Sequence, residues 1–138
     1  MPEPSQLRLI KRCLLFRKWD GAKLIPHITR GVYVLYKQKP AGSKQFSVVY
    51  IGVAGVGRNP KRGIHGRLKH HAERGSKKGK WGYYSAFEVH DNITRDEILE
   101  LEGLLLHIFR HDPRIKLQNR QLGLRRLKKV SRVERWKQ

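Results

Sequence analysis

The 138-residue chain contains one cysteine, Cys13, and it has no long hydrophobic run. A single cysteine excludes an internal disulfide and any zinc site built from cysteine pairs. The apolar stretches fall short of the roughly 20 residues that a membrane-spanning helix needs. The first residues also lack the apolar core of a signal peptide. We therefore expect a soluble protein, cytoplasmic or nucleoid-associated, with no membrane partner.

Acidic residues are also scarce, because 31 lysines and arginines face 11 aspartates and glutamates, for a formal net charge of +20. Self-repulsion of this size destabilises a compact chain, so we expect that the charge serves to bind a polyanion. Phosphate contacts supply most non-specific affinity for nucleic acid, which makes nucleic acid the leading candidate. Ribosomal and membrane-surface proteins can be equally basic, so charge alone does not separate these classes.

The length suits one domain, and β-branched and aromatic residues predict three strands within it. These strands are expected at Gly31–Lys37, Gln45–Val53 and Trp81–Val89. A short turn sequence, KPAGSK, joins the first two into an antiparallel hairpin. We expect an α/β (α+β) fold in which helices flank a small central antiparallel three-stranded sheet.

Apolar residues at helical spacing predict the helices. A short packing helix is expected over residues 6–18, and a second short helix over His65–Arg74. The next helix is expected to start at Thr94, which forms a capping box with Glu97, and to end near Arg110.

The predicted organisation is an N-terminal basic helical extension (1–27), a central domain (28–123) and a C-terminal basic helix or tail (124–138). The basic termini are expected to bind DNA non-specifically, to form a homodimer or to dock a partner protein.

Glu102 is the most informative residue from the pattern alone. On a helical wheel it shares a face with apolar residues, while the nearby acids fall where solvent reaches them. Its apolar neighbours on that face are Ile98, Leu105, Leu106 and Phe109. A carboxylate in an apolar stripe is costly unless a cation or hydrogen-bond donors meet it. Glu102 is therefore a candidate metal ligand, and the alternative is a structural salt bridge.

Arg67 and His71 lie four residues apart on the short second helix, so their side chains project from the same side. A guanidinium suits a phosphoryl oxygen, and an imidazole carries or relays a proton near neutral pH. The alternative is a solvated basic helix that rests on a phosphate backbone.

Tyr33 and Tyr50 lie on the first two strands. Strand alternation groups Tyr33 with Leu35, and it groups Tyr50 with Val48 and Phe46. Aromatic residues in strands are usually core or cross-strand packing, so this pair carries little by itself.

Basic residues are dense in the glycine-rich loop after the second strand and around the second helix. They are the candidate DNA-backbone contacts Arg58, Lys61, Arg62, Lys69, Lys77, Lys78 and Lys80.

Taken in order, these features resemble the GIY-YIG nuclease family. The resemblance covers roughly residues 28–123 and depends on Gly31-Val32-Tyr33, Tyr50-Ile51-Gly52, Arg67, His71, Glu102 and Asn119. Valine replaces isoleucine in the first motif. The basic residue often found shortly after the second motif is replaced by Val53, so its role is assigned to Lys61 or Arg62.

The resemblance implies a metal-dependent endonuclease that hydrolyses DNA phosphodiester bonds. Glu102 would hold Mg²⁺ or Mn²⁺, and Arg67 would brace the scissile phosphate. Tyr33 would orient or deprotonate the attacking water, while Tyr50 and His71 tune its hydroxyl. Asn119 would fix the local architecture.

Two alternatives remain open. One is a non-catalytic module that binds DNA or structured RNA with the same fold. The other is a basic structural protein of a ribonucleoprotein particle.

Overall fold

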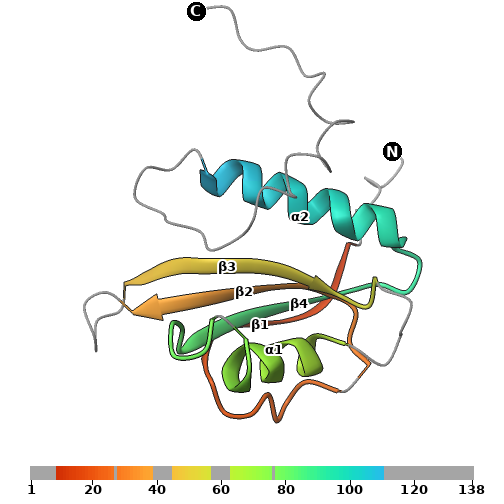
Figure 1. Ribbon diagram of the computed structural model, residues 1–138. Helices are drawn as coiled ribbons and strands as arrows, with labels where there is room; N and C mark the ends of the chain where they lie inside the picture. Colours follow the sequence, from red (N-terminus) through yellow and green to blue (C-terminus); the bar gives the residue numbers. More distant parts are fainter. Residues whose placement is uncertain (1–8, 27, 39–44, 57–62, 76, 111–138) are drawn as a thin grey trace, which may run out of the picture.

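A computed structural model describes residues 9–26, 28–38, 45–56, 63–75 and 77–110 (Figure 1). In chain order its elements are β1 (Ile10–Lys18), β2 (Gly31–Gln38), β3 (Phe46–Ala54), α1 (Ile64–Glu73), β4 (Tyr83–Val89) and α2 (Arg95–Arg110). The strands form one antiparallel sheet in the order β1-β4-β2-β3. Helix α1 lies against one face of this sheet and α2 against the other.

The N-terminal region differs most from the prediction. The helix expected over residues 6–18 is wrong, because Ile10–Lys18 is the strand β1, paired with β4. The register shifts between Ile10 and Arg12 and again between Leu14 and Arg17. These irregularities break the period-two alternation that identifies a strand in a sequence. The sheet therefore has four strands instead of three, and residues expected to form a helical extension belong to it.

Strand β3 contains a bulge at Val49, because its neighbours Val48 and Tyr50 pair with consecutive residues of β2. An extra residue reverses the side-chain alternation of a strand. Tyr50 consequently packs on the α1 side of the sheet with Tyr33, whereas Val48 and Phe46 pack on the α2 side. The predicted grouping of Tyr50 with Val48 and Phe46 is wrong for this reason.

Two apolar layers hold the helices to the sheet. On the α1 side, Ile64 and Leu68 are fully buried against the sheet. On the α2 side, Ile98 and Leu106 are buried against it.

The predicted capping box at the start of α2 is confirmed. The amide of Glu97 donates to Thr94 Oγ1 at 3.2 Å, and the amide of Thr94 donates to Glu97 Oε1 at 2.9 Å. These bonds satisfy amides that lack partners at a helix start.

Neither α2 nor α1, the helices in the described part of the chain, has the length and apolarity to cross a membrane.

Glycines permit close approaches at both sequence motifs. Gly31 has φ +153°, and a Cβ there would lie 1.9 Å from the carbonyl oxygen of Phe87 on β4. A Cβ on Gly52 would lie 2.4 Å from the hydroxyl of Tyr33 and 2.8 Å from the ring of Tyr50. Gly52 therefore lets the Tyr33 ring lie directly across the edge strand β3.

We predict that Gly52→Ala lowers the free energy of unfolding by about 1–3 kcal/mol, the usual cost of overpacking a core. The added methyl group must displace the ring of Tyr33 or Tyr50. The matched control is Gly66→Ala on α1, where a Cβ meets nothing within 4 Å. That control should gain about 0.5–1 kcal/mol, because alanine favours helix. Urea unfolding of both variants measures the contrast, and equal stabilities would contradict the packing argument.

Candidate active site

The hydroxyl of Tyr33 is the centre of the candidate site. It is hydrogen-bonded to Nε2 of His71, at an O···N distance of 2.8 Å. The Tyr50 ring lies beside both, with centroid distances of 6.1 Å to Tyr33 and 4.9 Å to His71. Strands β2 and β3 and helix α1 thus each contribute one ring to a single cluster.

The electrostatic environment connects Arg67 and Glu102 to this cluster. The pKa of Tyr33 is raised well above 10, first by burial and then by the neighbouring Tyr50 hydroxyl. Arg67 lowers this pKa and Glu102 raises it, so both charges act on the Tyr33 hydroxyl. The structure therefore brings together the predicted site residues Tyr33, Tyr50, Arg67 and His71, and it places the predicted Glu102 on α2 close enough for its charge to act on the Tyr33 hydroxyl.

Glu102 faces inward as the helical wheel predicted. It is 7% exposed, on the same side of α2 as the buried Ile98 and Leu106. Helix α2 packs against β3, the edge strand that the Tyr33 ring crosses at Gly52. This arrangement explains how a carboxylate on the α2 side of the sheet influences a hydroxyl on the α1 side.

The carboxylate of Glu102 is of the chemical type that binds Mg²⁺ and Mn²⁺. Among the described residues, no group of three or more histidine, cysteine, aspartate or glutamate side chains is arranged to hold a metal ion. Mg²⁺ usually keeps several waters and binds through one or two carboxylates together with substrate phosphates, so it does not need such a cage. Glu102 is therefore a suitable single protein ligand for Mg²⁺ or Mn²⁺.

His71 is buried and uncharged at neutral pH. Burial lowers its pKa to about 4, helped by the positive charges of Lys77 and Arg67. The indole Nε1 of Trp81 donates to the His71 carbonyl at 3.4 Å, which ties the end of α1 to the start of β4. A solvated α1 resting on a phosphate backbone does not describe His71, although it suits the exposed Lys69 on the same helix.

Lys77 has a more specific place than the sequence indicated. Its Nζ lies 4.5 Å from the centroid of the Tyr50 ring, within the range of a cation–π interaction. The sequence grouped it with the other basic residues after α1, and nothing in the local pattern distinguishes it from Lys78 or Lys80, which are exposed. The predicted Arg58, Lys61, Arg62 and Asn119 lie outside the described residues.

Exposure ranks the site residues by their access to a substrate. Tyr33 is fully buried, whereas Tyr50, Arg67 and Lys77 are half-buried. A phosphate group approaching from solvent would therefore meet the guanidinium, the ammonium group and the Tyr50 phenol before it met Tyr33.

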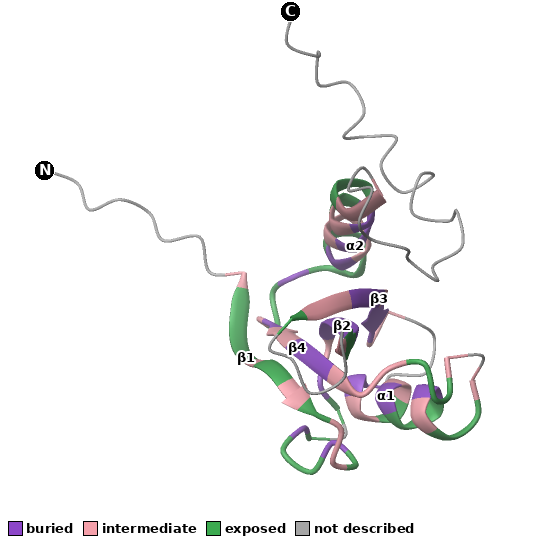
Figure 2. Cartoon of the chain, turned by 90° about the vertical axis from the view of Figure 1, so that its left-hand side faces the viewer, coloured by how far each residue is buried: buried purple, intermediate pink, exposed green. Residues whose placement is uncertain are grey.

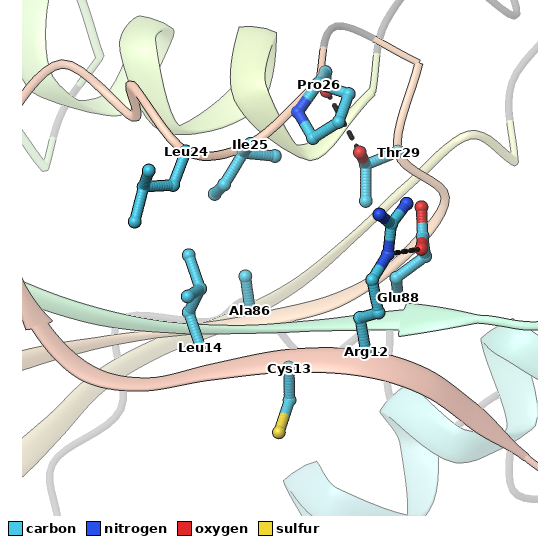
Figure 3. A pocket seen from close by; sticks show the side chains of 9 residues that line it. All are labelled: Arg12, Cys13, Leu14, Leu24, Ile25, Pro26, Thr29, Ala86 and Glu88. Atoms are coloured by element: carbon cyan, nitrogen blue, oxygen red, sulfur yellow. Dashed lines mark hydrogen bonds and ion pairs between the residues drawn. The ribbon is translucent and has the colours of Figure 1, made fainter.

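A separate pocket of about 330 Å³ lies at the opposite edge of the sheet, between β1 and the segment before β2 (Figure 3). Its walls are mainly apolar, and Arg12 Nε pairs with Glu88 Oε1 at 2.7 Å at one end. The side chain of Cys13 points away from it. None of the predicted site residues lines this pocket, so it is not the candidate site.

The lowered pKa of His71 predicts a pH-dependent stability. Unfolded His71 would titrate near 6.5, so between that pH and about 4 the unfolded chain binds more protons at this residue than the folded protein. The contribution of His71 to stability is therefore complete above pH 6.5 and is lost as the pH falls towards 4. We predict that His71→Gln flattens the change in unfolding free energy between pH 7 and pH 4.5, measured by urea titration. His107→Gln, at an exposed position on α2, should retain it. An unchanged pH dependence in His71→Gln would contradict the assignment.

No protein-family model matches the chain, and no curated protein or solved structure matches it either. Similarity to known proteins therefore adds nothing to the motifs in the sequence and to the geometry of the site.

Proposed function

We propose that the protein is a metal-dependent endonuclease that hydrolyses DNA phosphodiester bonds through a GIY-YIG-type site. The observation that carries the proposal is the convergence of polar side chains from β2, β3, α1 and α2 around the Tyr33 hydroxyl. A core that served packing alone would not need a buried carboxylate, a buried imidazole and a nearby guanidinium. The ordered sequence motifs identify the same residues independently.

Arg67 and Lys77 suit the substrate. Hydrolysis of a phosphodiester builds negative charge on the phosphoryl oxygens, and fixed positive groups stabilise that charge. The planar guanidinium of Arg67 can donate two parallel hydrogen bonds to a phosphate. Lys77, beside the Tyr50 ring, supplies a second positive charge at the mouth of the site. Lys77 is therefore a further candidate, beside the predicted Lys61 and Arg62, for the basic residue expected after the second motif.

Glu102 would hold the divalent cation. When bound, Mg²⁺ or Mn²⁺ supplies Lewis-acid stabilisation of the charge that develops on the leaving oxygen. The low local dielectric around this mostly buried carboxylate strengthens its attraction for a cation.

Tyr33 and Tyr50 differ in burial, and we assign them different roles for this reason. The raised pKa of Tyr33 keeps its hydroxyl protonated, which does not suit a residue that must deprotonate water. Neutral His71 can accept a hydrogen bond from the Tyr33 hydroxyl at Nε2, and this bond holds the two side chains together. The half-buried Tyr50 is the phenol placed to contact and orient the attacking water. Tyr33 is thus proposed as a positioning residue.

We predict that Glu102→Gln removes Mg²⁺-dependent nicking of supercoiled plasmid, with a loss of at least about 100-fold, because the charge that retains the metal is gone. DNA binding in EDTA should persist. The matched control is Glu100→Gln, a half-buried carboxylate on the same helix outside the inward stripe, which should keep its activity. Wild-type protein that binds DNA but cuts it with neither Mg²⁺ nor Mn²⁺ would refute the enzyme and favour a non-catalytic binding module.

A second variant tests the division between the tyrosines. Tyr50→Phe should lower the cleavage rate by about 10²–10⁴-fold, in the range typical of a lost proton-handling group. Its unfolding free energy should change little, since the half-buried ring is retained. Tyr84→Phe is the control, because Tyr84 is a buried tyrosine of the same apolar layer that contacts Trp19. Equal rates for Tyr50→Phe and the wild type would exclude Tyr50 from the chemistry.

A further inference from the structure

A cluster of aromatic rings lies on the α2 side of the sheet, at the end where β2 finishes and β3 begins. Each strand contributes one ring, and the cluster, here called the aromatic platform, consists of Phe16, Tyr36, Phe46 and Tyr83. Phe16 lies 4.9 Å from Tyr36 and 5.3 Å from Phe46 between ring centroids. The Phe46 and Tyr83 centroids are 4.9 Å apart. The rings thus form one continuous apolar surface across the sheet.

Among the described residues, none covers the platform on the β1 side. Helix α2 packs over β3 and β2, and neither described helix covers this face at β1 (Figure 2). Tyr36 is buried beneath the other rings, Phe46 and Tyr83 are half-buried, and Phe16 is 50% exposed. Aromatic surface is therefore available to a partner molecule at the rim of the sheet.

The exposed position of Phe16 is built into the backbone. Phe16 has φ +48°, a left-handed conformation that is unfavourable for a residue with a Cβ. It lies in the bulge of β1 between Leu14 and Arg17, and its amide donates to the Ser85 hydroxyl at 3.0 Å. The fold thus maintains an unfavourable backbone conformation that leaves a large ring exposed. Such conformations are concentrated at binding sites.

Positive charge lies beside the platform. Lys18 pairs with Tyr83 in the register of β1 and β4, which places it on the same face of the sheet. Lys18 is exposed, so its ammonium group is accessible to a ligand on the platform. Ring faces next to cations bind unpaired nucleobases by stacking while the cations contact the phosphates. Bases in a duplex are stacked on one another and offer no free ring face.

We propose that the aromatic platform binds the unpaired bases of single-stranded nucleic acid. A role in substrate selection rests on the proposed nuclease activity. For that activity, the platform selects substrates that contain a single-stranded segment. The platform is on the opposite face of the β2–β3 hairpin from Tyr33 and Tyr50, so one substrate can occupy both places only by passing around the sheet edge.

Fluorescence anisotropy in EDTA tests the binding without any cleavage. The full-length chain is titrated with labelled oligo-dT, oligo-rU and a DNA duplex of equal length. Phe16→Ala should weaken single-strand binding by about 5- to 100-fold, the range for loss of one stacked base, and duplex binding by less than about twofold. A loss confined to oligo-dT or to oligo-rU supports the proposal and shows which of the two single strands the platform binds. No loss, or an equal loss on the duplex, overturns it.

Leu15→Ala is the matched control, because Leu15 is a neighbouring side chain that is 58% exposed and has no ring. It should bind oligo-dT as the wild type does, and a loss equal to that of Phe16→Ala would overturn stacking as the cause. Phe16→Leu keeps most of the apolar volume and should still lose single-strand affinity.

Photocrosslinking of wild-type protein to 4-thiothymidine oligonucleotides needs no variant. Crosslinks at Phe16, Phe46 or Tyr83 support the platform, and crosslinks found only elsewhere overturn it. Since no metal is present, these results stand whether or not the protein cuts DNA.

Discussion

The buried hydrogen bond between the Tyr33 hydroxyl and Nε2 of His71 is the interaction on which the candidate site depends. It forms only because Gly52 leaves room for the Tyr33 ring to cross β3 and because α1 turns His71 towards the sheet. Burial makes each partner keep its neutral form, which is the form in which a phenol donates to an imidazole. The charges of Arg67, Lys77 and Glu102 act on this neutral pair. The same hydrogen bond thus fixes the positions of the two rings and the group on which these charges act.

The positive charges near the candidate site have two opposite effects. Arg67 and Lys77 attract phosphate, yet they also lower the pKa of His71. Glu102 is the acidic group that acts on Tyr33 from the other side, and a bound cation would neutralise it. Under the proposed function, a substrate phosphate would meet the cations and a metal ion would meet the carboxylate, so these charges would be neutralised in the occupied state.

The sequence predicted those parts that follow from regular periodicity. The strands around Tyr33 and Tyr50, the capping box at Thr94 and the inward direction of Glu102 all have the expected spacing. What it missed depends on irregular pairing. The bulges in β1 hid a strand, and the bulge at Val49 reversed the direction of Tyr50. The position of Lys77 over Tyr50 depends on a long-range contact, which no local pattern encodes.

The bulge at Val49 gives the β2–β3 hairpin two different aromatic faces. Tyr33 and Tyr50 lie on one side of it, while Tyr36 and Phe46 lie on the other. Side chains alternate between the two faces of a strand. Gaining or losing one residue beside Val49 would therefore move Tyr50 to the face that holds Phe46. Within the paired stretch, insertions or deletions would have to come in even numbers to keep Tyr33 and Tyr50 on the same side of the sheet.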